Sequence, residues 1–218
     1  MNERENNKMR FSGEIISEPT LTHTVLGEGF YEFNVRIMRL SGADDVIPVT
    51  ISERLLYGVE LEKGKKINAV GQFRSYNKSE EDHSRLMLTA FVQELLTGEC
   101  DENVNSITLK GYLCKPPVYR TTPFDREIAD VLIAVNRPNK RSDYIPCVAW
   151  GRNARFASTL SVGDQIAVSG RVQSREYQKK VSETETKTRT AYEVSISKIE
   201  LCCGSDDVDI ETDFVKCS

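Results

Sequence analysis

Residues 142–150 read SDYIPCVAW and residues 44–51 read DDVIPVTI, so the chain contains nearly the same strand sequence twice. The two copies lie 98 positions apart. The same spacing, or 99 after one inserted residue, relates further pairs: Gly13 and Gly111, Pro19 and Pro117, Arg39 and Arg137, Asp45 and Asp143, and Gly71 and Gly170. A register kept along most of each half indicates an internal repeat.

Alternation along a strand assigns each copy a core face and an outer face. The odd positions of the second copy are apolar and compact and should point into the core: Ile145, Cys147 and Ala149. The even positions should point outward: Tyr144, Val148 and Trp150. The first copy keeps apolar residues at its core positions, which are Ile47, Val49 and Ile51. Its outer positions carry no aromatic residue: Val46, Thr50 and Ser52.

Short runs with this alternation, separated by Gly, Pro and charged loops, are typical of antiparallel strands. In the second repeat the runs cover 106–114, 127–137, 143–150, 165–177 and 190–201, with the spacing of one short helix at 152–160. Five strands with a helix after the third is the order of an OB-fold, although another Greek-key barrel remains open. We predict an all-β protein with short helices and tandem OB-folds, each a five-stranded Greek-key barrel. The predicted units are a degenerate N-terminal OB-fold at 8–97, a C-terminal OB-fold at 105–201 and an acidic tail at 202–218.

The composition favours soluble globular domains, with 39% hydrophobic and 28% charged residues and no apolar run long enough for a membrane helix. The first ten residues lack the apolar core of a secretion signal, so we expect a cytoplasmic, nucleoid-associated protein. The net charge of −4 hides an uneven distribution. Residues 101–201 carry 16 basic and 12 acidic residues, whereas residues 1–100 carry 12 and 16. The second half is therefore better suited to a polyanion.

The six cysteines follow no pattern of a metal site or of a disulfide framework, since C-x-x-C is absent and Cys202 directly precedes Cys203. We expect reduced thiols, no metal and no cofactor. Nucleotide-binding and hydrolase motifs are also absent, so we do not expect an enzyme.

The run at 165–177 adds an outer row of basic, polar and aromatic residues: Arg171, Gln173, Arg175 and Tyr177. The corresponding row of the first repeat is weaker: Gln72, Arg74, Tyr76 and Lys78. Aromatic rings among arginines suit single-stranded nucleic acid, because each base has a π-face and each nucleotide a phosphate. Alternatives remain open: the aromatics could form a protein interface, Trp150 could cover the barrel end, and the basic residues could be a solvated face.

The second repeat resembles the bacterial single-stranded DNA-binding protein family over residues 105–201. The resemblance rests on ITLKGYLCKPPVYRTTP, ADVLIAVNR, SDYIPCVAWGRNA, LSVGDQIAVSGRVQSREY and AYEVSISKIEL. It implies OB-folds that coat single-stranded DNA with little sequence preference. It implies stacking by Tyr144, Trp150 and Tyr177 and basic contacts near Arg120, Arg137, Arg152, Arg171 and Arg175. Gln173, Lys179 and Lys180 complete the expected DNA-binding set, and Arg74 and Tyr76 are secondary candidates in the first repeat.

The sequence departs from the family in several places. No aromatic residue lies in NRPNK at 136–140, and TTPFDRE at 121–127 replaces the usual glycine-rich hairpin. Because the first repeat lacks the aromatic positions, we expect the second repeat to make most DNA contacts and the first to serve assembly. Chains with two OB-folds in this family resemble half a particle each, which implies a homodimer with four OB-folds.

The tail resembles the acidic family tails that recruit replication and repair proteins. The residues that carry this expectation are Asp206, Asp207, Asp209, Asp213 and Phe214. Phe214 is followed by VKCS rather than ending the chain after a proline, and an inert solvated tail is the alternative.

The expected function is sequence-independent binding and protection of single-stranded DNA in replication, recombination or repair. A primosome-type or protein-interaction OB module with weak nucleic-acid binding is the alternative. Stacking does not distinguish DNA from RNA, so the sugar of the ligand remains open.

Overall fold

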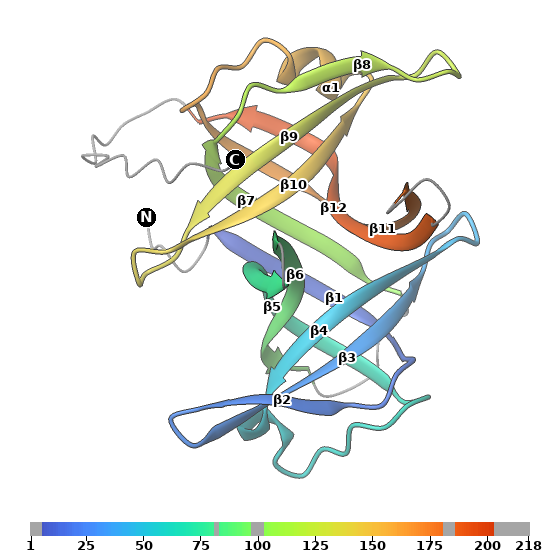
Figure 1. Ribbon diagram of the computed structural model, residues 1–218, viewed down its shortest axis with the longest axis vertical. Coiled ribbons are helices and arrows are strands. Elements are labelled where there is room, and N and C mark those ends of the chain that lie inside the picture. Colours follow the sequence, from blue (N-terminus) through green and yellow to red (C-terminus); the bar gives the residue numbers. More distant parts are fainter. Residues whose placement is uncertain (1–5, 81–82, 97–102, 181–185, 203–218) are drawn as a thin grey trace.

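The computed structural model describes residues 6–80, 83–96, 103–180 and 186–202. Their strands form one 12-stranded sheet in the order β2-β3-β4-β6-β5-β1-β7-β11-β12-β10-β9-β8 (Figure 1). Additional pairings, β3 with β1 and β7 with β9, close each half into a barrel. The prediction of an all-β fold with short helices is confirmed.

The first half contains β1 (Asn7–Ile15), β2 (Thr20–Val25), β3 (Glu28–Met38), β4 (Asp44–Ser52), the 3₁₀ helix η2 (Glu53–Leu56), β5 (Lys66–Glu80) and β6 (His83–Leu95). The second half contains β7 (Asn105–Leu113), β8 (Val118–Thr121), β9 (Glu127–Asn136), β10 (Ser142–Trp150), α1 (Arg152–Ala157), β11 (Gln165–Lys180) and β12 (Thr186–Leu201). All five predicted strands of the second repeat are present. The domain boundaries at 8–97 and 105–201 stay predictions.

Two local elements differ from the expectation. The edge strand β8 was not predicted, because all four of its side chains are exposed and it shows no apolar alternation. The helix ends at Ala157 rather than at 160, and Ser158 and Thr159 continue it as turns through bonds to the carbonyls of Ala154 and Phe156. No helix in the described part of the chain is long and apolar enough to cross a membrane.

The repeated glycines Gly13 and Gly111 lie where each barrel closes. A β-carbon at Gly13 would lie 2.3 Å from the carbonyl oxygen of Arg36, and one at Gly111 would lie 2.3 Å from that of Ala134. Any side chain would therefore force the closing strands apart, which explains why both copies contain glycine.

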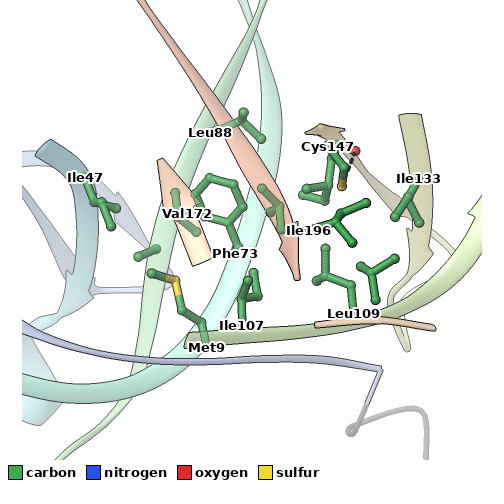
Figure 2. Close-up of a cluster of buried hydrophobic side chains, with 14 of the residues drawn as sticks. Met9, Ile47, Phe73, Leu88, Ile107, Leu109, Ile133, Cys147, Val172 and Ile196 are labelled. Carbon is green, nitrogen blue, oxygen red and sulfur yellow. Dashed lines mark hydrogen bonds between the residues drawn. The ribbon is translucent and has the colours of Figure 1, made fainter. Parts of the chain in front are cut away.

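The apolar side chains of both halves form one continuous core (Figure 2). The core positions predicted from alternation are all buried: Ile47, Val49, Ile51, Ile145, Cys147 and Ala149. The outer positions Thr50, Ser52 and Val148 are also buried, which the sequence did not predict. Thr50 is bonded to Thr89 at 2.8 Å between their Oγ1 atoms, and Ser52 donates to Glu28.

The two halves join through antiparallel pairing of β1 with β7, in which Met9 lies opposite Ile107. Matched residues of the two repeats form hydrogen bonds across this junction, each repeat bonding to the other in the same way. Asp45 accepts a bond from the backbone N–H of Ser174 at 3.0 Å, and Asp143 accepts one from Ser75 at 2.5 Å. The hydroxyls of the same serines accept from the backbone N–H groups of Val46 and Tyr144, at 2.9 and 2.8 Å. The halves are therefore related by an approximate two-fold axis.

Each buried aspartate also binds the arginine six residues before it. Arg39 Nε donates to Asp45 and Arg137 Nε to Asp143, both at 2.7 Å. Arg137 Nη2 also donates to the carbonyl of Ser75 at 3.0 Å. The assignment of Arg137 as a DNA contact stays a prediction, and in the structure its guanidinium is bonded to Asp143 and to the Ser75 carbonyl. We call these residues the junction network: Arg39, Asp45, Ser75, Arg137, Asp143 and Ser174.

Replacing Asp45 with Ala should lower the free energy of unfolding by about 2–3 kcal/mol, because it leaves Arg39 and the Ser174 N–H without their acceptor. The neighbouring substitution Asp44→Ala is the matched control. Asp44 is exposed and its Oδ2 atom lies 4.0 Å from Arg36 Nε, so its loss should change stability by less than about 0.5 kcal/mol. Urea unfolding measures both, and equal effects would contradict the role of the junction network.

Candidate nucleic-acid interface

The outward side chains of β10, β12 and β11 share one face of the second repeat. Strand register places Val148 beside Ser195 and Ser195 beside Arg171, with Gln173 beside Glu193 in the next row. Because strand side chains alternate, Tyr144, Trp150, Arg175 and Tyr177 lie on the same side. We call these residues the C-terminal outer face: Tyr144, Val148, Trp150, Arg171, Gln173, Arg175, Tyr177, Glu193 and Ser195.

The periphery of the C-terminal outer face is exposed and its centre is not. Tyr144, Trp150 and Tyr177 are 44%, 40% and 38% exposed. The central residues are buried: Val148, Gln173 and Ser195. The three aromatic rings are thus held against a buried centre on one side and exposed on the other. Their exposed sides can stack on bases, and the packed sides limit their rotation.

The assignment of Gln173 as a DNA contact stays a prediction, and in the structure its side chain is bonded inside the protein. Its Nε2 atom donates to Glu193 Oε1 at 2.7 Å, and both side chains are largely shielded. Arg175 Nε lies 3.8 Å from the same carboxylate oxygen and remains mostly exposed. Gln173 thus positions Glu193, and Glu193 attracts the guanidinium that could otherwise meet a phosphate.

Arg171 reaches from this face toward the first repeat. Its Nε atom lies 4.0 Å from Asp45 Oδ2 and has no hydrogen-bond partner among the residues that the structure describes. The side chain is nevertheless 43% exposed, so the rest of the guanidinium remains open to a ligand.

The end of the face beyond Trp150 carries further cations. Trp150 lies opposite Ile128 on β9, and Ile128 lies opposite Arg120 on β8. Arg120 forms an exposed ion pair with Asp130 at 3.0 Å, and Arg152 is exposed at the start of α1. The basic residues predicted around Trp150 therefore lie near it, although one of them is partly neutralised.

One aromatic residue at this end was not predicted. Phe124 occupies the turn between β8 and β9 and is 85% exposed. In the sequence, Phe124 is a large apolar residue inside the polar turn TTPFDRE. Strand alternation does not apply to a turn, so it cannot assign Phe124 to a face.

The first repeat has an aromatic cluster of its own on its outer face. Arg74 Cζ lies 3.7 Å from the centre of the Phe91 ring, whose centre is 6.0 Å from that of Phe30. Phe30 stacks on His23 with ring centres 5.0 Å apart. Tyr76 is half-exposed on β5 beside Arg74. The candidates Arg74 and Tyr76 thus lie near two aromatic rings, Phe30 and Phe91, that were not predicted from the sequence.

Phe30 and Phe91 were missed because they do not occupy the positions of the aromatics in the second repeat. By the repeat spacing, Phe30 corresponds to Ile128. By strand register, Phe91 beside Thr50 corresponds to Ser195 beside Val148. Apart from Tyr76 on β5 and Tyr177 on β11, the two outer faces therefore place their aromatic rings on different strands.

Some predicted residues lie at or beyond the limits of the described structure. Lys179 and Lys180 belong to the last residues of β11, where only the backbone is described. The tail candidates Asp206, Asp207, Asp209, Asp213 and Phe214 lie outside the described residues.

The structure describes three cysteines outside disulfides: Cys114, Cys147 and Cys202. Burial strongly raises the pKa of Cys147, so this thiol is neutral and unreactive at physiological pH. Among the residues that the structure describes, no three His, Cys, Asp or Glu side chains are grouped to hold a metal ion.

Comparison with known proteins separates the two repeats. Residues 104–202 match the Single-strand binding protein family. The single-stranded DNA-binding protein of Oceanobacillus iheyensis is 37% identical over 82 residues, covering 34% of this chain and 51% of that protein. Single-stranded DNA-binding protein A of Bacillus subtilis is 37% identical over 82 residues, covering 34% and 48%. The chain spans about half the length of the curated relatives it matches.

The fold likeness extends over both repeats. The crystal structure of the wild-type single-stranded DNA binding protein from Thermus aquaticus superposes with a TM-score of 0.73 at 21% identity, over 93% of this chain and 96% of that one. A deletion mutant of the same protein gives 0.69 at 22% identity. The family resemblance expected from the sequence is confirmed for the second repeat, because residues 104–202, somewhat less than half of the chain, match the Single-strand binding protein family.

Proposed function

We propose that this protein binds single-stranded DNA with little sequence preference and protects it during replication, recombination or repair, without enzymatic activity. The observation that carries the proposal is the C-terminal outer face, which exposes three aromatic rings beside Arg171 and Arg175. The match of residues 104–202 to the Single-strand binding protein family supports it. Such a protein acts in the cytoplasm at the nucleoid.

The chemistry of this face favours strands of any sequence. Stacking on Tyr144, Trp150 and Tyr177 is available to every base, because each has a π-face, at roughly 1–3 kcal/mol per base. Arginines neutralise phosphates, which are identical in every nucleotide. The amide of Gln173 is engaged by Glu193 and is not available to recognise base edges.

We also propose a homodimer with four OB-folds. Strands β1 and β7 already pair with each other inside the chain, so a second copy cannot use those edges and must contact another surface. The acidic tail is a proposed docking segment for replication or repair proteins.

A protein-interaction role with weak nucleic-acid binding is the second candidate. It is favoured by the carboxylates close to the cations of the face, since Asp130 pairs with Arg120 and Glu193 lies near Arg175. An aromatic surface with internally paired charges also suits a protein partner.

Substituting Tyr144, Trp150 and Tyr177 together with Ala should weaken oligothymidylate binding by at least about 100-fold, given the stacking free energy per base. Fluorescence anisotropy of a labelled oligomer measures this, and sedimentation reports the oligomeric state. The control is Tyr57→Ala, since Tyr57 is exposed and lies outside the face. Unchanged DNA binding with dissociated protein oligomers would favour the protein-interaction role.

In the wild type, Trp150 is the single tryptophan, and its fluorescence should be quenched by oligothymidylate.

The salt dependence of DNA binding should show how many cations of the second repeat contact phosphates. If Arg120, Arg152, Arg171 and Arg175 each engage one phosphate, these four contacts should contribute about −2.8 to the slope of log K against log salt, at roughly 0.7 per contact. A titration series between low and moderate salt measures the slope. A flat dependence would refute the electrostatic part of the proposal.

Replacing Glu193 with Gln should strengthen binding by about 2- to 5-fold at low salt, because the attraction 3.8 Å from Arg175 disappears while the bond to Gln173 can be kept. Glu200→Gln is the matched control, as Glu200 lies on the same strand and pairs with Lys198. Equal affinities for Glu193→Gln and the wild type would show that Arg175 does not contact the phosphates.

A further inference from the structure

A cavity of about 200 Å³ opens where the two repeats meet. Strands β1 and β5 of the first repeat line one side, and the β9–β10 turn of the second repeat lines the other. Its polar residues are two arginines, one carboxylate and five amides: Arg74, Arg137, Asp143, Asn6, Asn7, Gln72, Asn136 and Asn139. We call this space the junction cavity.

The charges inside the junction cavity do not balance. Asp143 is the carboxylate of the lining, and it is engaged by Arg137 and by the backbone N–H of Ser75. Arg74 instead donates from Nε and Nη2 to the neutral oxygen of Gln72, at 3.1 and 2.9 Å. Within the described part of the chain, Arg74 forms no ion pair, although its guanidinium is stacked on Phe91. The described lining therefore carries a net positive charge, since Asp143 faces two arginines, Arg74 and Arg137.

The equivalent place in the other repeat is built differently. There the positions of Gln72 and Arg74 are occupied by Arg171 and Gln173, and Gln173 donates to Glu193. In the first repeat the residue beside Arg74 is Thr89, which bonds to Thr50. The carboxylate found beside the second-repeat pair is thus absent beside Arg74.

We propose that the junction cavity is an anion subsite that takes a phosphate group of single-stranded DNA, with Arg74 as the charged contact. This inference rests on the proposed function. It is supported by position, because the backbone N–H of Tyr144 donates to Ser75 Oγ at 2.8 Å, so the strand that carries Tyr144 directly adjoins Arg74 and Tyr76. A phosphate held at this point supplies the missing counter-charge through charge-assisted hydrogen bonds.

The protonation state of Arg74 agrees with this role. Burial and the positive charge of Arg137 lower the pKa of Arg74 to about 10, and the carboxylate of Asp143 offsets part of this effect. The guanidinium therefore remains charged at neutral pH, but it is held where a charge is poorly compensated. An anion that enters the cavity relieves this deficit and gains more than it would beside an exposed arginine.

The test measures binding of the full chain to a labelled oligothymidylate of about 30 nucleotides, long enough for two OB-folds, over a salt series. Arg74→Gln should lower affinity about 5- to 10-fold at low salt and make the slope less negative by about 0.7, the value of one phosphate contact. Arg74→Lys keeps the charge and should restore the slope. Arg36→Gln is the matched control, since Arg36 pairs with Glu14 at the β1–β3 seam and should leave the slope unchanged.

A second variant addresses the case in which Arg74→Gln does not fold. Gln72→Glu leaves Arg74 in place and supplies an internal carboxylate that competes with the phosphate. It should therefore also make the slope of log K against log salt less negative by about 0.7. Thermal unfolding with inorganic phosphate alone distinguishes a free anion from the DNA backbone. Two results together would overturn the assignment to DNA. Inorganic phosphate would stabilise the wild type but not Arg74→Gln, and the variants would keep the wild-type salt slope of oligothymidylate binding.

The two proposals fail in different ways. Wild-type slopes in both Arg74→Gln and Gln72→Glu, with Trp150 still quenched by the oligomer, would overturn the junction subsite and leave the proposed function intact. Absence of binding by the wild type would overturn both.

Discussion

The arrangement of the whole molecule depends on two buried carboxylates, Asp45 and Asp143. A buried charge is costly unless it is paired and hydrogen-bonded, and each aspartate obtains its partners from both repeats. The arginine comes from its own repeat and the backbone N–H of a serine comes from the other. Neither barrel can therefore satisfy its aspartate without the other in register, which fixes how the two outer faces are placed.

This constraint separates the residues that had to stay alike from those that could change. The glycines at the barrel closures and the apolar core positions are kept in both repeats, because changes there would open a barrel or the junction. The outer faces carry no such requirement, and their aromatics differ: β10 and β11 hold them in the second repeat, whereas the first repeat has Phe30 on β3, Tyr76 on β5 and Phe91 on β6. The first repeat consequently has an aromatic face of different design, rather than a bare one.

The features that could be predicted from the sequence are those set by local alternation. The five strands of the second repeat, its core positions and the exposure of Tyr144, Trp150 and Tyr177 all follow from a period of two. Long-range partners could not be predicted in this way. The repeat spacing shows Arg137 and Asp143 as a matched pair, but their partner Ser75 lies 68 residues from Asp143, and alternation assigns no contacts across a junction. The burial of Gln173 was missed for the same reason, because Glu193 comes from another strand.

The net charge of the chain is a poor guide to its partner for a related physical reason. Several acidic residues act inside the fold, where Asp45 and Asp143 hold the junction and Glu193 holds Gln173. Their charges are compensated locally by Arg39, Arg137 and Arg175, so these pairs contribute little to the field that a distant polyanion meets. What a bound strand meets at contact distance is set instead by cations whose side chains remain exposed, such as Arg152, Arg171 and Arg175. A chain with a formal charge of −4 can thus present locally cationic surfaces, because its carboxylates are concentrated where the fold requires them.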